Sequence, residues 1–450
     1  MKNEKLNILR EKIDDLDNRI LNLIEERSNI VNQIGRLKDK SKSIVDPNRE
    51  KIIINRLKKS FKGFYSKDTI VRIWRELFYA SSKIQMNLNE TISSKRGIEN
   101  VKIYKGGKSS IEGISRFTKL SSNENSFGPS DKVLEILKKE DSINRYPEIS
   151  GHSLRIKLSK IHNIDPEQII LGNGSDEILF MSALAFCHPG DEIIHSQYCF
   201  EMYPIITKLV GAVSVIADEE NFKVKINSII NNISDSTKVI FLANPNNPTG
   251  TFLTINEIQK LLESIPKNII VVIDTAYAEY VNDEKYDNSF NLLKQHENVI
   301  ITRTFSKAYG LAGIRLGWCY TSKKVALILN KIKPPFNVNS LALKISNVAL
   351  EDIDYLDHVI NKNKKNKIWF EEELNKLNIK FLPSFANFTL IECKHNSNES
   401  DEIYNLLIKN GIIIRQLHSY NLPNFLRITI GTKSEMKKIV NILSHKKIGK

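Results

Sequence analysis

Four polar turns carry residue types that could do chemistry, and each follows a short apolar run. They are 172–177 (GNGSDE), 244–250 (NPNNPTG), 274–277 (DTAY) and 304–307 (TFSK), the last with Arg315 eight residues beyond Lys307. The first leads into a helical pattern, whose initial N–H groups could bind a phosphate. Singly, a glycine turn is most often only a turn, an Asp at a strand end a helix cap and a lone Lys a solvated side chain. Together, the spacing is specific.

This set resembles the class I/II aminotransferases of fold type I that use pyridoxal phosphate. The matching residues are Asn247, Asp274, Tyr277, Lys307 and Arg315, and the resemblance covers about residues 98–440. Four further motifs are similar to the histidinol-phosphate aminotransferase branch: 120–129 (LSSNENSFGP), 145–147 (RYP), 334–339 (PPFNVN) and 426–431 (LRITIG). Members of that branch use several substrates.

The resemblance implies pyridoxal phosphate as cofactor and a role for each matching residue. Lys307 would form the Schiff base and later shuttle the proton. Asp274 would pair with the pyridinium nitrogen, and Asn247 and Tyr277 would hydrogen-bond the 3-oxygen. Phe200 would stack on the ring. The residues expected to hold the cofactor phosphate are Gly174, Ser175, Thr304, Ser306 and Arg315.

Two more residues and two departures complete this comparison. Tyr146 would reach the phosphate of the neighbouring subunit, and Arg427 would bind the substrate carboxylate bidentately. Thr275 stands where the family usually has Glu, and 196–199 (SQYC) replaces a more usual proline-containing run. Both leave the substrate open. A decarboxylase or lyase on the same fold also stays open, because these motifs do not fix the reaction type.

Polar residues also interrupt two apolar helix faces in the first ninety residues. Arg27 lies in a stripe that should be dry, as does Ser81, with Gln85 one turn beyond. A buried guanidinium needs an anion. Two readings are open from the pattern: a substrate anion, or a register-fixing ion pair with Glu25, Glu50 or Glu76.

The same region resembles the all-helical chorismate mutases over about residues 4–88. The motifs are 9–13 (LREKI), 16–17 (LD), 26–27 (ER), 35–38 (GRLK) and 46–50 (DPNRE). The resemblance implies that Arg10, Arg27 and Arg49 hold substrate carboxylates or hydroxyl oxygens. It places Lys38 and Gln85 at the ether oxygen, and Asp46, Glu50 and Ser81 at the hydroxyl and neighbouring groups. The family fold is an intertwined dimer, in which the residue matching Arg10 reaches into the partner's site.

The chemistry of that reaction agrees with these residue types. Converting chorismate to prephenate is a unimolecular rearrangement without proton transfer or covalent intermediate. The enzyme need only hold a compact dianion and stabilise charge on the ether oxygen, which calls for Arg and Lys but no nucleophile or metal.

Periodicity predicts the elements that position these residues. An apolar stripe with 4-3 steps predicts a helix over 4–40: Leu9, Ile13, Leu16, Ile20, Leu23, Ile30, Ile34 and Leu37. Such a helix cannot bury its stripe alone and needs partners, including a second copy of itself. A second helix, 48–60, is capped by Asp46-Pro47 and ended by Gly63. A third starts near Asp68, with a stripe at Ile70, Trp74, Leu77, Ser81, Ile84 and Leu88.

From Ile98 onward, short apolar runs alternate with amphipathic stretches, which is typical of α/β proteins. The runs 169–171, 239–242, 269–273 and 299–301 are the clearest strands. We therefore expect an all-α chorismate mutase domain at 1–90 and a polar linker at 91–97. An α/β transferase would follow at 98–450. It would comprise a large domain at about 120–330 and a smaller α+β domain at about 331–450 that includes the N-terminal arm.

Composition restricts the remaining possibilities. The net charge of +14 fits nucleic acid, membranes or small anionic substrates alike. Four cysteines without CxxC spacing favour a reducing cytosol. We find no secretory signal, no membrane-length apolar run and no P-loop, HExxH or GxGxxG motif, so we expect a cytoplasmic enzyme without metal. A nucleic-acid adaptor is disfavoured, because no aromatic–basic interleaving appears.

These observations favour a bifunctional enzyme of aromatic amino acid biosynthesis that acts on small molecules as a homodimer or higher oligomer. Its aminotransferase would convert prephenate to arogenate, since prephenate is already an α-keto acid and no intervening catalytic domain is present. Arg415 would then bind the second carboxylate beside Arg427, although a phosphate could use it too. The alternative is a histidinol-phosphate or phenylpyruvate aminotransferase whose helical domain dimerises or senses an effector.

Overall fold

The computed structural model describes most of the chain. The described residues are 2–37, 46–86, 95, 97–101, 103–104, 106–113, 115–139, 144–393 and 397–445. The chain forms two compact units, residues 1–99 and 100–450, and each is described by itself. Among the described residues, no helix is both long and apolar enough to cross a membrane.

The first unit consists of three helices, α1 (Lys2–Leu37), α2 (Pro47–Ser60) and α3 (Lys67–Met86), followed by a short turn, η1 (Ile98–Asn100). The predicted cap of α2 is confirmed, since the Asp46 side chain accepts a hydrogen bond from the Arg49 N–H at 3.0 Å. The predicted extent of this helix, to about Ser60 and before Gly63, is confirmed. The helix stops at Ser60 because Phe61 is already extended. The expected linker lies almost entirely outside the described residues.

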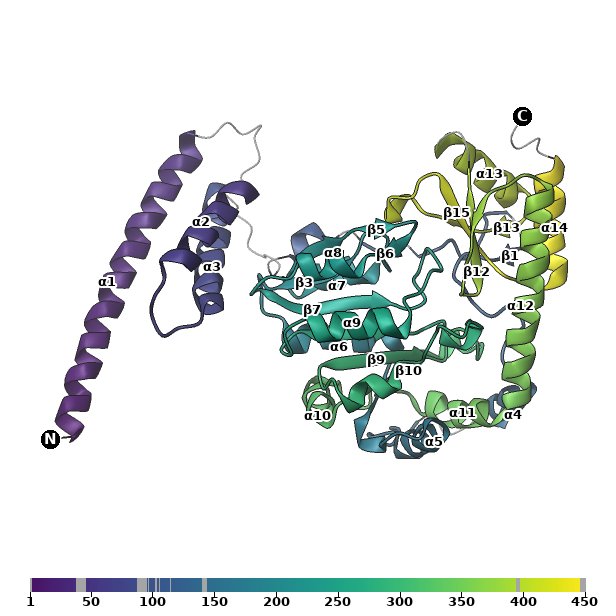
Figure 1. Ribbon diagram of the computed structural model, residues 1–450, viewed down its shortest axis with the longest axis horizontal. Helices are drawn as coiled ribbons and strands as arrows, with labels where there is room; N and C mark the ends of the chain where they lie inside the picture. Colours follow the sequence, from purple (N-terminus) through teal and green to yellow (C-terminus); the bar gives the residue numbers. More distant parts are fainter. Residues whose placement is uncertain are drawn as a thin grey trace. The chain divides into compact units, whose positions relative to one another are not determined.

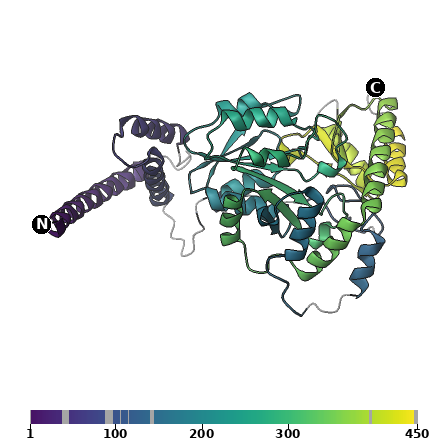
Figure 2. The same cartoon turned by 60° about the horizontal axis from the view of Figure 1, so that its bottom comes forward.

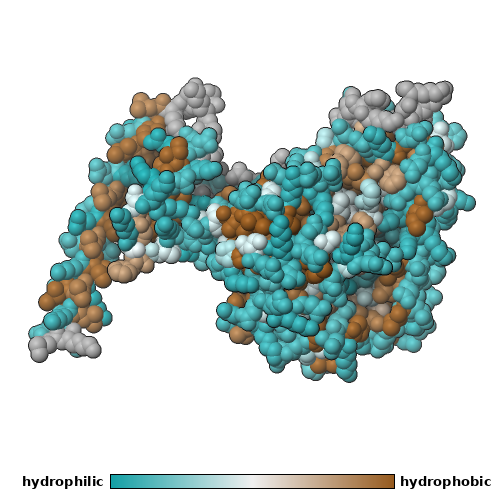
Figure 3. All heavy atoms as spheres, viewed as in Figure 1, coloured by the Kyte–Doolittle hydropathy of each residue, from teal (hydrophilic) through white to brown (hydrophobic). Residues whose placement is uncertain are grey.

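The apolar stripe of α1 stays exposed within the single chain. Its eight residues are between 40% and 87% exposed, and Figure 3 shows apolar side chains along the helix. The buried apolar side chains of the unit are Val31, Ile70, Val71 and Phe78. Val71 and Phe78 were not in the predicted stripe of α3. That helix packs against both α1 and α2, so its buried face is wider than a 4-3 stripe.

The second unit is built on a seven-stranded sheet, and its fold confirms the predicted α/β class. The strand order is β2-β10-β9-β8-β7-β3-β4, with β10 antiparallel to both neighbours and the other pairs parallel. The strands are β2 (Ile169–Gly172), β3 (Glu192–Ser196), β4 (Val213–Ala217), β7 (Thr237–Ala243), β8 (Ile270–Asp274), β9 (Val299–Thr304) and β10 (Gly317–Thr321). The four apolar runs singled out in the sequence form β2, β7, β8 and β9.

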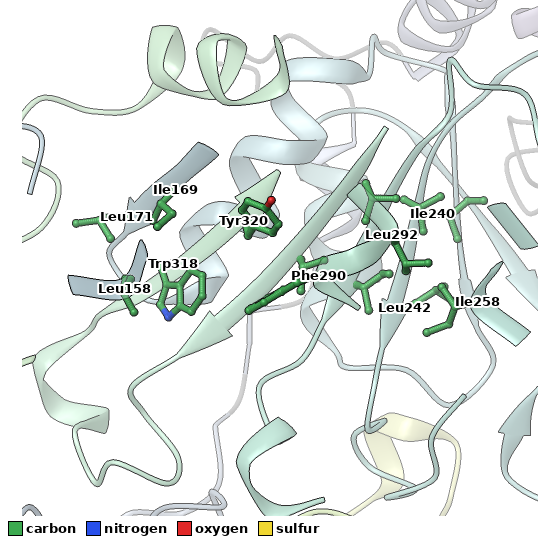
Figure 4. Packing of buried hydrophobic residues seen from close by; sticks show 14 of the residues in the cluster. Leu158, Ile169, Leu171, Ile240, Leu242, Ile258, Phe290, Leu292, Trp318 and Tyr320 are labelled. Carbon is green, nitrogen blue, oxygen red and sulfur yellow. The ribbon is translucent and has the colours of Figure 1, made fainter. Parts of the chain in front are cut away.

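Helices cover both faces of this sheet, which explains why its strands are continuous apolar runs. Alternate side chains of each strand point to opposite faces. Leu242 and Trp318 face one core and Phe241 and Cys319 the other (Figure 4 shows the first). The first core packs against α4 (Asp131–Lys139), α5 (His152–His162), α8 (Ile226–Asn231), α9 (Ile255–Ser264) and α11 (Ser340–Glu351). The second packs against α6 (Ser175–Phe186), α7 (Met202–Leu209) and α10 (Lys323–Ile332).

A smaller antiparallel sheet, in the order β11-β12-β15-β14, completes the unit. Its strands are β11 (Phe381–Leu382), β12 (Phe388–Glu392), β14 (Arg415–Gln416) and β15 (Phe425–Thr429). Helices α12 (Ile353–Lys376), α13 (Ser397–Lys409) and α14 (Lys433–His445) pack around it, with α12 and α14 side by side (Figures 1 and 2). The early strand β1 (Thr118–Lys119) joins this half by pairing with β13 (Ile412–Ile413). A two-stranded ribbon pairs β5 (Glu219–Glu220) with β6 (Lys223–Val224).

Short 3-10 turns connect these elements. They are η2 (Pro166–Gln168), η3 (Ala278–Tyr280), η4 (Phe290–Lys294), η5 (Ala312–Ile314) and η6 (His418–Tyr420).

Candidate active sites

The main cavity of the α/β unit lies where parallel strands end. Asp274 and Thr304 are the last residues of β8 and β9, and Asn247 follows β7. Because the carboxyl ends of parallel strands share one edge of the sheet, these side chains open into one cavity of about 380 Å³.

Eleven residues predicted for the transferase line this cavity. They are Ser175, Phe200, Asn247, Asp274, Tyr277, Thr304, Ser306, Lys307, Arg315, Arg415 and Arg427. Gly174 adjoins it through Arg315. Tyr146 does not line it. Its ring is 81% exposed and stacks on Phe336, with 4.5 Å between ring centroids. Its proposed role in a neighbouring subunit stays a prediction.

Asp274 is a buried carboxylate without a cation. Its oxygens accept hydrogen bonds from Thr302 Oγ1 at 3.0 Å and Tyr203 Oη at 3.2 Å, and it forms no ion pair with any described residue. Burial raises the pKa of Asp274 to about 6, although these two hydrogen bonds oppose the rise. The site therefore favours a ligand that brings a positive charge to this carboxylate.

Lys307 lines the cavity and is close to two other lining residues, Ser122 and Tyr277. Its ammonium donates to the Ser122 carbonyl at 3.3 Å and lies 5.7 Å from the centre of the Tyr277 ring. The Tyr277 hydroxyl accepts a hydrogen bond from Asn123 Nδ2 at 2.9 Å. The Lys307 side chain is half-buried and lines the cavity, so its amine is accessible to a ligand there, as a nucleophilic lysine must be.

Backbone geometry at one end of the cavity suits an anion. Helix α6 begins at Ser175 after Gly174, whose φ is +83°. A Cβ on Gly174 would lie 2.5 Å from Arg315 Nη2, and a Cβ on Gly317 would lie 2.3 Å from the Ser175 nitrogen. Arg315 is itself left-handed, with φ +59°, a strained conformation that is concentrated at functional sites. The two glycines thus let the Arg315 guanidinium and the first turn of α6 pack closely, which gathers N–H donors for an anion at a helix N-terminus. Gly317 was not predicted from the sequence.

Arg427 is held by neutral groups. Its guanidinium donates to Asn247 Oδ1 and, at 2.9 Å, to the Ser121 carbonyl, and its Nε is buried without a partner among the described residues. No described carboxylate pairs with it. A buried, uncompensated guanidinium at the cavity wall is ready to bind an anionic ligand.

Arg415 differs from this, and its partner was missed in the sequence. Arg415 lies opposite Arg427 in the β14–β15 pair. Its Nη2 donates to Glu201 Oε2 at 2.7 Å. Tyr104 and Tyr420 also line this side of the cavity. The only sequence signal for Glu201 was its position directly after Phe200, because nothing in the chain order relates α7 to β14.

The helical unit brings part of the predicted mutase set together. Arg27 Nη1 donates to Ser81 Oγ at 2.6 Å and to the Leu77 carbonyl at 3.3 Å. Burial lowers the pKa of Arg27. The Gln85 Oε1 is buried and without a partner in the described residues, and its side chain packs at Gly35.

The register-fixing alternative for Arg27 finds no support, since in the described part of the chain its guanidinium forms no ion pair with Glu25, Glu50 or Glu76. Arg10 and Arg49 are exposed. Asp46 serves as the α2 cap, and Glu50 is half-buried in the first turn of α2. Lys38 lies outside the described residues.

Comparison with known proteins identifies both units. Residues 115–443 match the family model described as aminotransferase class I and II. The chain belongs to the class I and II aminotransferases. This aminotransferase also carries, at residues 9–86, a match to the model described as chorismate mutase type II. The predicted recognition of both families is confirmed, and the chain combines an isomerase domain with a transferase domain.

Two relatives that match the aminotransferase unit are named histidinol-phosphate aminotransferases. A histidinol-phosphate aminotransferase 2 of Haemophilus influenzae (strain 86-028NP) is 40% identical over 357 residues, which is 78% of this chain and 97% of the relative. A histidinol-phosphate aminotransferase of Pelagibacter ubique is 42% identical over 348 residues, 76% and 96% of the two chains. The solved histidinol-phosphate aminotransferase of Sinorhizobium meliloti, in complex with pyridoxal-5'-phosphate, shares the fold. Its TM-score is 0.73 at 23% identity, covering 80% of this chain and 98% of that one.

The class I and II aminotransferases depend on pyridoxal phosphate, and the residues present fit that cofactor. Asp274 offers a buried carboxylate for a protonated ring nitrogen, and the start of α6 at Ser175, with the Arg315 guanidinium packed against Gly174, offers N–H donors suited to a phosphate. Among the described residues, no group of three or more His, Cys, Asp or Glu side chains is arranged to hold a metal ion.

Proposed function

We propose that the chain catalyses two reactions of aromatic amino acid biosynthesis. The helical unit rearranges chorismate to prephenate, and the aminotransferase unit transfers an amino group to an aromatic-pathway keto acid, namely prephenate, giving arogenate. One observation carries this proposal: a single chain holds a mutase-type guanidinium without a carboxylate partner, Arg27, and a transaminase cavity with two arginines on its wall.

In the mutase step the protein binds and orients a dianion. Arg27, fixed by Ser81, would hold a substrate carboxylate, and the Gln85 Nε2 group would donate to the ether oxygen. Arg10, Lys38, Arg49, Asp46 and Glu50 would supply the remaining contacts, with Arg10 acting in the partner's site. The stabilisation is electrostatic and requires no proton transfer.

In the transferase step, pyridoxal phosphate supplies an electron sink that stabilises negative charge at the substrate α-carbon. Arg315, Ser175, Thr304 and Ser306 would hold its phosphate, and Gly174 would let the Arg315 guanidinium approach the start of α6. Asp274 would keep the ring nitrogen protonated, and Asn247 and Tyr277 would orient the 3-oxygen. The Phe200 ring would cover one face. The Lys307 amine would attach the cofactor and move the α-proton.

Arg427 would bind the α-carboxylate of the keto acid, because it is buried and has no carboxylate partner in the described residues. Prephenate brings a second carboxylate, and Arg415 is the nearest additional guanidinium across the strand pair. The names of the relatives favour a second candidate, transamination of histidinol phosphate, in which these arginines would bind the substrate phosphate.

A homodimer would explain the exposed stripe of α1. Eight large apolar side chains on one helix are too many to leave in water, and a second copy of the helical unit could cover them and supply Arg10. All four cysteines are free, as expected in the reducing cytoplasm that we propose as the location.

Two experiments test this function. First, kcat/KM is measured for prephenate, phenylpyruvate, 4-hydroxyphenylpyruvate and imidazole acetol phosphate, because specificity is the ratio of these values. We expect prephenate to give the highest value. A higher value for either monocarboxylate would assign late aromatic transamination, and a higher value for the imidazole substrate would assign the activity in the relatives' names.

Second, Arg27→Ala should lower prephenate formation at least ~100-fold, because a substrate anion loses its guanidinium. Transamination should persist. Arg19→Ala is the matched control, since Arg19 is an exposed arginine of the same helix. Loss of both activities in Arg27→Ala would mean that Arg27 is structural, and full mutase activity would remove it from the site.

A further inference from the structure

The two arginines on the cavity wall differ in one respect: within the described part of the chain, a carboxylate neutralises Arg415 but not Arg427. Arg427 and Arg415 occupy opposite positions of β15 and β14, and both are buried. Arg427 donates to an amide oxygen and a carbonyl and lies over the Phe388 ring, and no carboxylate of the described residues compensates its charge. Arg415 is paired with Glu201 at 2.7 Å, and the two side chains are only 10% and 14% exposed. One arginine is available to an anion, and the other already has one.

Glu201 stands next to the cavity wall: it is not among the described residues that line the cavity, but its partner Arg415 is. Glu201 directly follows Phe200, which lines the cavity, and it stands at the start of α7, so its backbone is fixed by the same turn. Tyr104 and Tyr420 line the cavity beside Arg415. Burial raises the pKa of Tyr420, so its hydroxyl stays protonated. This side of the cavity thus presents two aromatic rings and an ion pair of zero net charge.

That arrangement has opposite effects on two kinds of substrate. A substrate with one carboxylate binds Arg427 and leaves the Arg415–Glu201 pair intact. A substrate with a second carboxylate near Arg415 meets the Glu201 carboxylate and must share Arg415 with it or displace it. Arginine has five N–H donors and can bind two carboxylates, but two carboxylates that contact the same guanidinium repel each other.

An aminotransferase admits its amino donor and its keto acceptor to the same cavity in turn, so the cavity must suit both side chains. We propose that Glu201 is a specificity-determining residue of this cavity. It competes with the second carboxylate of a substrate for Arg415, so that one site accepts side chains with and without a negative charge. This inference rests on the proposed transaminase function and specifies its substrate class. Glu201 favours substrates with one carboxylate, and a substrate with two binds by sharing Arg415 with Glu201 or by displacing it.

The test compares Glu201→Gln with wild type as the full-length holoenzyme. The substitution keeps the shape and removes the charge. kcat/KM is measured for one amino acid with a single carboxylate, phenylalanine, and one with two, glutamate, and for prephenate as acceptor. The ratio of dicarboxylate to monocarboxylate kcat/KM should rise roughly tenfold or more, because a like charge beside the bound anion is removed.

Glu279→Gln is the matched control. Glu279 pairs with Arg303 at 2.9 Å, and both side chains are as buried as the Glu201 pair, but neither lines the cavity. The control should leave the substrate ratio unchanged while losing a comparable ion pair. If Glu201→Gln does not fold, Glu201→Asp serves instead, since the shorter side chain withdraws the carboxylate from Arg415 and should shift the ratio in the same direction.

An unchanged or lowered ratio in the Glu201 variant would overturn this inference. An equal change of the ratio in both variants would also overturn it, because the effect would then be structural. Failure of the proposed function looks different. The wild-type enzyme would then not transaminate prephenate, whereas the glutamate-to-phenylalanine ratio would still report on Glu201.

Discussion

Asp274→Asn should make the cofactor-free protein more stable at neutral pH. Burial raises the pKa of Asp274 from 3.8 to about 6. A carboxyl with a raised pKa contributes stability below its unfolded pKa near 4, and this contribution is lost as the pH rises through 6, because the folded state binds more protons. At 1.36 kcal/mol per pKa unit, ionising the folded carboxylate costs about 3 kcal/mol at pH 8. Roughly half of this loss of folding free energy develops between pH 5 and pH 8.

The assay is urea unfolding of cofactor-free protein at several pH values, followed by tryptophan fluorescence. Building both proteins on Trp74→Phe leaves Trp318 and Trp369, both in the α/β unit, as the reporters. The stability of the variant minus that of wild type should grow by about 1.5 kcal/mol from pH 5 to pH 8. The variant should also bind the cofactor more weakly, since the ring nitrogen loses its counter-charge.

Asp352→Asn is the control for the substitution itself. The hydrogen bond from Lys132 lowers the pKa of Asp352, so its titration lies below pH 4 and its effect should not vary between pH 5 and pH 8. A difference for Asp274→Asn that is equally independent of pH would refute the reasoning, because the carboxylate would then not be destabilised by burial.

Three other perturbations have defined outcomes. Borohydride reduction of the holoenzyme and peptide mapping should place the cofactor on Lys307, and a label on another lysine would contradict the assignment. Gly174→Ala should raise the cofactor Kd at least ~10-fold in a fluorescence titration, since a Cβ would lie 2.5 Å from Arg315 Nη2 at a φ of +83°, and an unchanged Kd would argue against the phosphate site there. Substituting Leu16→Lys in the α1 stripe should shift the protein toward monomer in sedimentation velocity, while Asp15→Lys on the same helix should not. Equal behaviour of the two variants would remove the stripe from the interface.

Local chemistry made much of the fold and the cavity predictable. Continuous apolar runs such as 239–242 are typical of strands buried on both faces, and a polar residue at the end of such a run must emerge at the sheet edge. This is why Asp274 and Thr304 could be placed in one site before any contact was known.

Contacts between distant segments were not predictable in this way. Tyr203 and Thr302 hold Asp274, and Glu201 holds Arg415, across separations of up to 214 residues, and no periodicity encodes which pairs meet. The end of α2 at Ser60 is set locally: Phe61 leaves the helical conformation before Gly63 is reached, with its N–H bonded to the Leu57 carbonyl.

Two contacts join the start of the α/β unit to its end and affect the order in which the chain folds during synthesis. One is the pairing of β1 with β13, and the other involves Asn123. The Asn123 N–H donates to Thr429 Oγ1, 306 residues away, so the small sheet cannot close until nearly the whole chain has left the ribosome. Synthesis runs from the N-terminus, and domains fold as units in that order. The helical unit is complete by residue 99, so its residues emerge while the transferase is still being translated. Arg415 and Arg427 reach the cavity last. If the helical unit dimerises as we propose, two nascent chains on one message would assemble through their first ninety residues before either transferase cavity is complete.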